Sequence, residues 1–296
     1  TAFREAFIAV KSGLYDVVVA VGAEKNPAGM LSAGNSEGPP PEGLFGSGTM
    51  PALFAEAGVL HAAAYGTTLE QFAKVSVKNH HHSTMNPKAM YQKETPLEEV
   101  LASEMIAWPL TKLMCSVNVD GAAATVLVSE RKARELGLGR AVRVRGSALA
   151  SDPWESRNGV LMNTNSVTRL AVATAYEMAG VGPQDLNLVE LHDCFATAEL
   201  LHYENLGLCG EGEAGALIDS GDTALGGRIP VNVSGGLLSK GHPIGATGVA
   251  NIVEIVMHLR GEAGARQVAG ARLGLAHVLG FGVGVGAAGV HILERA

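Results

Sequence analysis

The chain has 296 residues, of which 47% are hydrophobic and 17% are charged, so it is long enough for one large globular domain or two closely packed ones. Its formal net charge of -7 and its pI near 5.8 give no basic excess for binding nucleic acid or an anionic membrane. No apolar run reaches the roughly 18 residues of a membrane span, and the first residues resemble an amphipathic helix rather than a signal peptide. We therefore expect a soluble cytoplasmic protein.

The three cysteines, Cys115, Cys194 and Cys209, lack the C-x-x-C spacing of a zinc knuckle and suggest no disulfide framework. We expect all three to be reduced thiols. The sequence begins with Thr1, inside an expected helix and without an initiator methionine, so we expect a further part of the natural chain to precede it.

The first half alternates helices and strands around one irregular excursion. Residues 17–21 form a continuous apolar run, which predicts a strand covered on both faces. Residues 26–48 are rich in glycine, proline, serine and asparagine and predict a loop that leaves the core. The other expected elements are helices at 1–12, 51–64, 68–79, 96–104 and 131–136 and a strand at 125–129.

The second half repeats this alternation. We expect strands at 142–149, 186–191 and 272–279 and helices at 167–178 and 249–259. Residues 121–131 and 286–295 both read Gly-Ala-Ala, then an apolar strand, then Glu-Arg. The match suggests an internal duplication, although small residues before a strand are also common in packed sheets.

The stretch from Gly235 to Gly248 holds five glycines and His242 directly before an expected helix that opens at Thr247 or Gly248. A helix N-terminus carries free N–H groups and a partial positive charge, which suit a developing oxyanion or a bound anion. His242 could donate a hydrogen bond into the same place. The alternative is a tight turn in which the glycines only allow close packing and His242 is incidental.

The expected strand at 186–191 runs directly into His192, Asp193 and Cys194. Residues i and i+2 of an extended segment face the same side, so His192 and Cys194 point together and Asp193 points away. A neighbouring histidine can lower the pKa of a thiol and make it a proton carrier or nucleophile. The alternative is a core histidine with satisfied hydrogen bonds beside an inert buried cysteine.

Residues 190–195 (ELHDCF), 199–209 and 234–248 together resemble the thiolase superfamily, most closely the sterol-carrier-protein-X type and its bacterial relatives. The resemblance also includes residues 21–25, 78–83, 120–123 and 260–264. It implies an α/β fold: a duplicated, layered αβαβα sandwich with an inserted loop domain and a first half that is incomplete at its N-terminus. The implied halves are residues 1–138, with the insertion at about 30–109, and residues 139–296.

The resemblance implies an acyltransferase of the acetyl-CoA acetyltransferase type, active in lipid metabolism, with coenzyme A as substrate and without metal or redox cofactor. It gives His242 the activation of a nucleophilic cysteine and the binding of the thioester oxygen. His192 stands where many thiolases carry an asparagine that positions a water, and Cys194 matches the acid/base cysteine. The backbone N–H of Gly280 matches a second oxyanion donor, although Val278 replaces the usual cysteine there. Residues implied to bind substrate and coenzyme A are Ser234, Gly235 and Gly236.

The usual nucleophilic cysteine is not found, because it would precede Thr1; neither Cys115 nor Cys209 has the loop-to-helix setting that depresses a thiol pKa. Other functions therefore stay open: retro-aldol cleavage of a CoA ester, or a non-catalytic CoA-thioester-binding subunit with an OB-fold partner. A plain CoA-thioester-binding module is a further alternative. The family also implies a homodimer or tetramer. We interpret His80, His81 and His82 as part of a solvated loop rather than a metal site.

Overall fold

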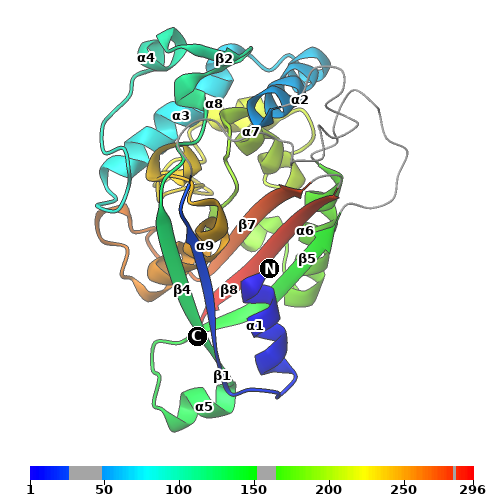
Figure 1. Ribbon diagram of the computed structural model, residues 1–296, viewed down its shortest axis with the longest axis vertical. Helices are drawn as coiled ribbons and strands as arrows, with labels where there is room; N and C mark the ends of the chain where they lie inside the picture. Colours follow the sequence, from blue (N-terminus) through cyan, green and yellow to red (C-terminus); the bar gives the residue numbers. More distant parts are fainter. Residues whose placement is uncertain (27–48, 152–164, 283–284) are drawn as a thin grey trace.

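The computed structural model describes residues 1–26, 49–151, 165–282 and 285–296, and its strands form two main sheets (Figure 1). The first sheet is an antiparallel ribbon of β1 (Val17–Glu24) and β4 (Gly121–Val128). The second has four strands in the order β5-β8-β7-β6, in which only the β6–β7 pair is parallel. Its strands are β5 (Val142–Ser151), β6 (Leu188–Glu190), β7 (Leu273–Gly282) and β8 (Val285–Arg295).

Helix α9 (Ile244–Arg260) lies between the two sheets, in contact with β1 and β4 on one side and with β6, β7 and β8 on the other. Its apolar residues Ile252 and Ile255 are buried in a cluster that also holds Phe3 of helix α1 (Ala2–Lys11). Because α9 is apolar on several faces, it is stable only in such an interior position. Helix α6 (Ser166–Ala179) packs on β5 and β8, so the order of layers is ribbon, helices, sheet, helix.

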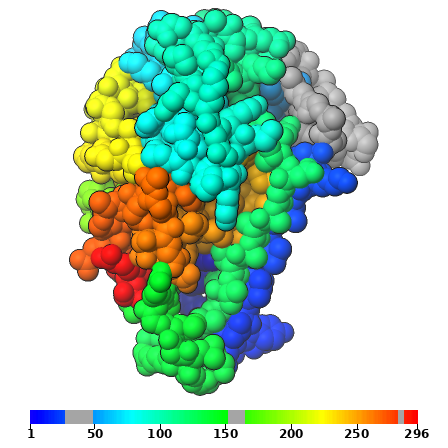
Figure 2. Space-filling model, turned by 90° about the vertical axis from the view of Figure 1, so that its left-hand side faces the viewer, coloured from blue at the N-terminus to red at the C-terminus, as the bar shows by residue number. Residues whose placement is uncertain are grey.

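A cap of helices covers one end of these layers (Figure 1). A capping box of Thr68 and Gln71 fixes the start of its helix α3, where the Thr68 hydroxyl accepts from Gln71 N at 3.2 Å. The cap contains α2 (Met50–Tyr65), α3 (Leu69–Thr84), α4 (Leu97–Ala102), α7 (Ala196–Asn205), α8 (Ala214–Asp219), β2 (Met105–Ala107) and β3 (Leu110–Thr111). At the opposite end, α5 (Glu130–Glu135) projects beyond the ribbon, and Figure 2 shows β4 running beside β1 towards it.

Four short turns complete the described elements. Three are 3-10 helices, η2 (Lys112–Met114), η3 (Pro183–Asp185) and η5 (Gly264–Arg266). The fourth, η4 (Gly236–Lys240), is a π-helical turn within the glycine-rich stretch. After this turn, helix α9 begins at Ile244, which is earlier than the expected Thr247 or Gly248.

The interpretation of the three adjacent histidines as a solvated loop is wrong. Helix α3 continues to Thr84, and it buries His80 and His82 while His81 stays exposed. The ring of His82 lies 3.0 Å from the carbonyl oxygen of Asn232 and accepts from Leu225 N at 2.9 Å. These two backbone partners offset the cost of burying the imidazole.

The expectation that the first strand is covered on both faces is also wrong for the described residues. Val17, Val19 and Val21 are 46%, 55% and 58% exposed. Only the face that carries Ala20 and Gly22 is buried, because α1 and α9 both pack on that side. The predicted loop at 26–48 lies almost wholly outside the described residues.

Residues 121–128 and 285–295 both form strands, β4 and β8, and the internal duplication stays a prediction. Among the described residues, no helix combines the length and the apolarity that crossing a bilayer requires.

Gly22 is the closest point between the ribbon and α9, and it offers a test of this packing. A Cβ atom at Gly22 would lie 2.3 Å from Gly245 O and 2.9 Å from Ala246 Cα, which are backbone atoms that cannot rotate away. We expect Gly22→Ala to lower the free energy of unfolding by about 1–3 kcal/mol, the usual range for overpacking. Urea unfolding monitored by circular dichroism measures the change.

Gly139→Ala is the matched control, because an added Cβ at Gly139 meets nothing within 4 Å. Equal unfolding midpoints for the two variants would show that β1 does not press against α9 as described.

Candidate functional site

A cavity of about 410 Å³ opens between the cap and the carboxyl end of the parallel strand pair. The four predicted catalytic residues line it together, although they come from separate segments: His192, Cys194, His242 and Gly280. Cys115 lines it as well. The rest of the wall is mostly apolar and includes Phe54, Phe195 and Leu238. A concave, largely apolar cavity with a few convergent polar groups is the usual form of a small-molecule site.

The segment after β6 places the first two of these side chains. The carbonyl oxygen of Cys194 accepts from Ser116 N at 2.9 Å, and Cys115 forms a β-bridge with Phe195. His192 and Cys194 face the cavity and Asp193 faces away from it, as predicted, although the chain turns here instead of staying extended, with Asp193 N donating to Leu191 O at 3.2 Å. The backbone N–H of His192 points at His277 Nδ1, 3.4 Å away.

Hydrogen bonds fix the orientation and the tautomer of His242. Its backbone N–H donates to Val117 O at 2.8 Å, and its Nδ1 lies 2.8 Å from Thr247 Oγ1. The Thr247 hydroxyl donates its single hydrogen to Pro243 O at 3.0 Å, so it can only accept from His242. Nδ1 therefore carries the proton, and Nε2 of His242 is left with a lone pair, the form required of a base.

Burial keeps both histidines uncharged. It lowers the pKa of His242 to about 4, with a further contribution from Lys240. It also lowers the pKa of His192 well below its ordinary value, helped by His242 and His202. The two rings stand edge to face with centroids 5.1 Å apart, so the cavity presents two neutral imidazoles at neutral pH.

The three thiols are not activated. Burial and the neighbouring Asp193 raise the pKa of Cys194 well above its ordinary value, contrary to the lowering that His192 was expected to cause. The reason is that His192 is itself buried and neutral, so it has no charge with which to stabilise a thiolate. Burial likewise raises the pKa of Cys115 and of Cys209 to about 12.

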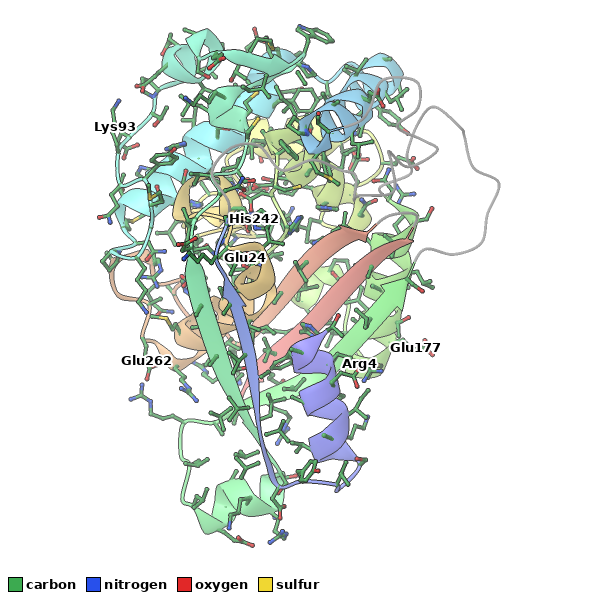
Figure 3. The ribbon with its side chains drawn as sticks, in the orientation of Figure 1. Arg4, Glu24, Lys93, Glu177, His242 and Glu262 are labelled. Atoms are coloured by element: carbon green, nitrogen blue, oxygen red, sulfur yellow. The ribbon has the colours of Figure 1, made fainter. Side chains whose placement is uncertain are left out.

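The N-terminus of α9 already holds an anion. Gly245 N donates to Glu24 Oε2 at 3.0 Å, and Figure 3 places Glu24, at the end of β1, close to His242. The helix end thus attracts negative charge as the sequence predicts, but a carboxylate of the chain itself occupies it. The nearby groups that remain for an oxyanion are those of the cavity lining, which include the rings of His192 and His242 and the backbone of Gly280.

Three further candidates lie outside the cavity lining. Ser234 is buried and contacts Glu190 through its backbone N–H at 3.0 Å and its hydroxyl at 2.6 Å. Gly235 and Gly236 open the turn η4, and Gly236 faces the carboxylate of Asp193. Their predicted contact with substrate stays a prediction.

The sequence did not reveal several residues that line the cavity, among them His80, Tyr91, Lys112 and Asn118. The rings of His80 and Tyr91 stack with centroids 5.7 Å apart, and burial lowers the pKa of His80. Only His80 belongs to a stretch that the sequence singled out. Within the described ranges, no group of three or more His, Cys, Asp or Glu side chains is arranged to hold a metal ion.

Comparison with known proteins identifies the family. A family model described as "Thiolase C-terminal domain-like" matches residues 156–295. The acetyl-CoA acetyltransferase of Methanothermobacter thermautotrophicus is 42% identical over 99% of this chain and 76% of its own length. The chain therefore belongs to the thiolase superfamily.

Within that superfamily, the matches point to the sterol-carrier-protein group. Sterol carrier protein 2 of Bos taurus is 42% identical over 92% of this chain, which spans about half, 53%, of that protein. The solved structure of the Ltp2–ChsH2(DUF35) aldolase superimposes with a TM-score of 0.83 at 28% identity, over 99% of this chain and 76% of that one. The thiolase fold expected from the sequence is confirmed.

The buried histidines predict a pH-dependent stability. Burial lowers the pKa of His202 and of His291 to about 3 and that of His242 to about 4, against about 6.5 in an unfolded chain. Between these pKa values the unfolded state therefore binds more protons than the folded state. The free energy of unfolding falls as the pH drops from about 6.5 towards 4, whereas above pH 6.5 the contribution of the neutral buried histidines to stability is complete. Each such histidine contributes up to about 1.4 kcal/mol per pH unit.

Urea unfolding at pH 7, 6 and 5 measures the slope, and His202→Gln should reduce it. His81→Gln, at an exposed histidine of the same chain, should leave the slope as it is. An unaltered slope in His202→Gln would contradict the neutral burial of His202.

Proposed function

We propose that this protein is a thiolase-type acyltransferase that makes or cleaves 3-ketoacyl-CoA through an acyl-cysteine intermediate. The observation that carries the proposal is the convergence of His192, Cys194 and His242 on one largely apolar cavity. Membership of the thiolase superfamily and similarity to an acetyl-CoA acetyltransferase support it.

The proposed cleavage uses these groups in sequence. A thiol that loses its proton to His242 Nε2 attacks the C3 carbonyl of the 3-ketoacyl-CoA. The C2–C3 bond then breaks, the acyl group stays on the sulfur, and the electron pair forms the enolate of acetyl-CoA. Cys194 protonates C2 of that enolate, and its thiolate later takes the proton of an incoming CoA thiol. The CoA thiolate then attacks the acyl-cysteine, and the cysteine thiolate that leaves recovers its proton from His242.

The protonation states suit these roles. A thiol with a raised pKa, such as Cys194, stays protonated at neutral pH and can act as an acid, and its buried thiolate is then a strong base. His192 and protonated His242 would donate hydrogen bonds to the thioester oxygen of the enolate, with the Gly280 backbone N–H as a further candidate donor.

The acylated cysteine is proposed to be none of the three in this chain. Cys194 has the acid/base role, and the raised pKa values of Cys115 and Cys209 oppose thiolate formation. We propose that the nucleophile comes from outside residues 1–296.

The second candidate function is retro-aldol cleavage of a CoA ester, and the structural similarity to the Ltp2–ChsH2(DUF35) aldolase favours it. That reaction forms the same type of enolate but needs a base at a C3 hydroxyl instead of a nucleophile at C3. A non-catalytic CoA-thioester-binding subunit with an OB-fold partner is the third possibility.

Two assays separate these functions. A thiolase cleaves one 3-ketoacyl-CoA per site without free CoA and gains the mass of an acyl group on one cysteine, and it turns over repeatedly only when free CoA is added. An aldolase cleaves a 3-hydroxyacyl-CoA without free CoA and without a mass change. Binding of acyl-CoA with neither reaction would indicate a binding subunit.

The proposed roles predict an order among three variants. In the complete enzyme, which includes the proposed nucleophile, His242→Ala should suppress both acyl-enzyme formation and turnover, because it removes the base. Cys194→Ala should still form acyl-enzyme from a simple acyl-CoA, while carbon–carbon cleavage falls by roughly 100-fold or more, the scale of general acid–base catalysis. His192→Asn should be mildest, since an amide can hold a water in that place.

Steady-state rates and mass-detected acyl-enzyme for the three variants measure this order. Near-normal cleavage by Cys194→Ala would overturn its assignment as the acid/base.

We also propose a homodimer or tetramer. The exposed valines of β1 leave an apolar strip on the ribbon, and such strips are often covered in assemblies. Light scattering coupled to size exclusion should give at least twice the monomer mass of 30.5 kDa. An active monomer would contradict the proposal.

A further inference from the structure

Asp193 lies between two cavity residues but faces the opposite way, into the protein, where it is completely buried. Its carboxylate accepts three hydrogen bonds. Leu237 N donates to Oδ1 at 2.8 Å, Leu238 N donates to Oδ2 at 3.3 Å, and Asn79 Nδ2 donates to Oδ2 at 2.8 Å. A buried carboxylate surrounded in this way is fixed in position, because every contact would be lost if it moved.

Two of these donors belong to the turn η4, which runs from Gly236 to Lys240. The turn is flanked by Gly235 at φ 100 and Gly241 at φ 115, in the left-handed region that favours glycine. A single π-helical turn leaves its first amides without partners inside the turn. Asp193 supplies those partners from a segment more than forty residues earlier, in the manner of a helix N-cap.

The contact between carboxylate and turn is as close as glycine permits. A Cβ atom at Gly236 would lie 2.0 Å from Asp193 Oδ2. Further along the same turn, Leu238 lines the cavity, and His242 follows the turn by two residues. The beginning of the segment that carries His242 is therefore held by Asp193, and its end by the bond from His242 N to Val117 O.

On its other side, Asp193 is linked through Asn79 to a second buried carboxylate, that of Glu199. Asn79 Nδ2 also donates to Glu199 Oε2 at 2.8 Å. Glu199 in turn accepts from Lys78 Nζ at 2.5 Å and from Asn232 Nδ2 at 2.7 Å. Asp193 is thus linked to α3 and α7 as well as to η4, and these partners leave it little freedom.

We propose that Asp193 is a positioning residue, which holds the turn η4 and thereby sets the place of His242 relative to His192 and Cys194. This proposal rests on the proposed function only for the statement that the three side chains act in one reaction. The positioning of His242 by Asp193 is argued from the hydrogen bonds alone. Asp193 is not itself among the residues that line the cavity; it acts through the backbone of the turn, which includes the cavity residue Leu238.

Asp193→Asn keeps the size of the side chain but replaces one acceptor oxygen by an NH2 group. Since all three neighbours are donors, at least one of them then faces an N–H group. We expect the turn to shift and water to reach His242. The pKa of His242, which burial and Lys240 lower to about 4, should then rise by about one unit or more towards the ordinary value of about 6.5.

The test is a pH titration of the His242 ring by NMR in protein labelled at histidine, with the signal assigned through His242→Gln. Glu254→Gln is the matched control: Glu254 is also a buried carboxylate, paired with Arg266 at 2.5 Å, but it has no hydrogen bond to η4. It should lower stability and leave the His242 titration as in the wild type. Turnover of Asp193→Asn should fall about 100-fold, the effect of misplacing a reacting group by about 1 Å, with KM for CoA little altered.

An unchanged His242 titration in Asp193→Asn, together with a loss of stability like that of Glu254→Gln, would overturn the proposal and leave Asp193 a purely structural residue. If Asp193→Asn does not fold, Asn79→Ala replaces it. That variant removes one of the three donors, so it should shift the His242 pKa in the same direction by a smaller amount, and no shift would again overturn the proposal. A complete wild-type enzyme, with the proposed nucleophile present, that shows no thiolase activity would contradict the proposed function alone, because the titration does not depend on turnover.

Discussion

The structure depends on charged groups that are buried together where the cap meets the core. Lys78 of α3 and Glu199 of α7 are both nearly inaccessible, and their 2.5 Å contact is one of the links between these helices. Taking two charges out of water is costly, and removing one partner of such a pair costs about 3–5 kcal/mol because the other is left uncompensated. The pair therefore fixes α3 against α7 within the cap. The bonds from Lys78 Nζ to Val231 O at 2.9 Å and from Asn232 Nδ2 to Glu199 Oε2 at 2.7 Å then link both helices to the segment that bridges to β6.

The same burial determines the chemistry of the cavity. In a site with little water, an imidazole is neutral and a thiol is protonated, as the lowered pKa of His242 and the raised pKa of Cys194 show. The cavity is uncharged at these groups before a substrate enters, and charge would develop only during a reaction. Donors held in place by backbone contacts stabilise such developing charge without having to reorganise.

Sequence reasoning predicted those features that depend on local pattern. The alternation along residues 192–194 gives the directions of His192, Asp193 and Cys194, and the periodicity of residues 249–259 gives most of α9. It could not give contacts between distant segments. Glu24 meets the N-terminus of α9 from 221 residues away, and the burial of His82 depends on Leu225 and Asn232.

Strand β1 is a second case in which contacts between distant segments could not be predicted from the sequence. An apolar run such as residues 17–21 indicates that both faces of the strand could be buried. It does not indicate which elements pack on each face, because that depends on the three-dimensional arrangement of the chain. In the described residues, α1 and α9 cover one face and leave Val19 of the other exposed. The effect of His192 on Cys194 fails to follow from sequence for a related reason, since a neighbour lowers a thiol pKa only if it is charged.

The two reactions considered for this cavity, thiolase cleavage and retro-aldol cleavage, would share the formation of an enolate and differ only at the C3 carbon. Thiolase cleavage and retro-aldol cleavage both leave the electron pair on C2 of a CoA thioester, and both need donors at the thioester oxygen and an acid for C2. Under the proposed function, His192, His242 and Cys194 would supply those needs in one cavity, where burial keeps these three groups uncharged. The two reactions differ at C3, where one requires a nucleophilic thiol and the other a base at a hydroxyl, so His242 Nε2 can serve either. Under the proposed function, the identity of the reaction would thus depend on one added group beside His242, while Asp193 and the turn it holds would serve the enolate half that both reactions share.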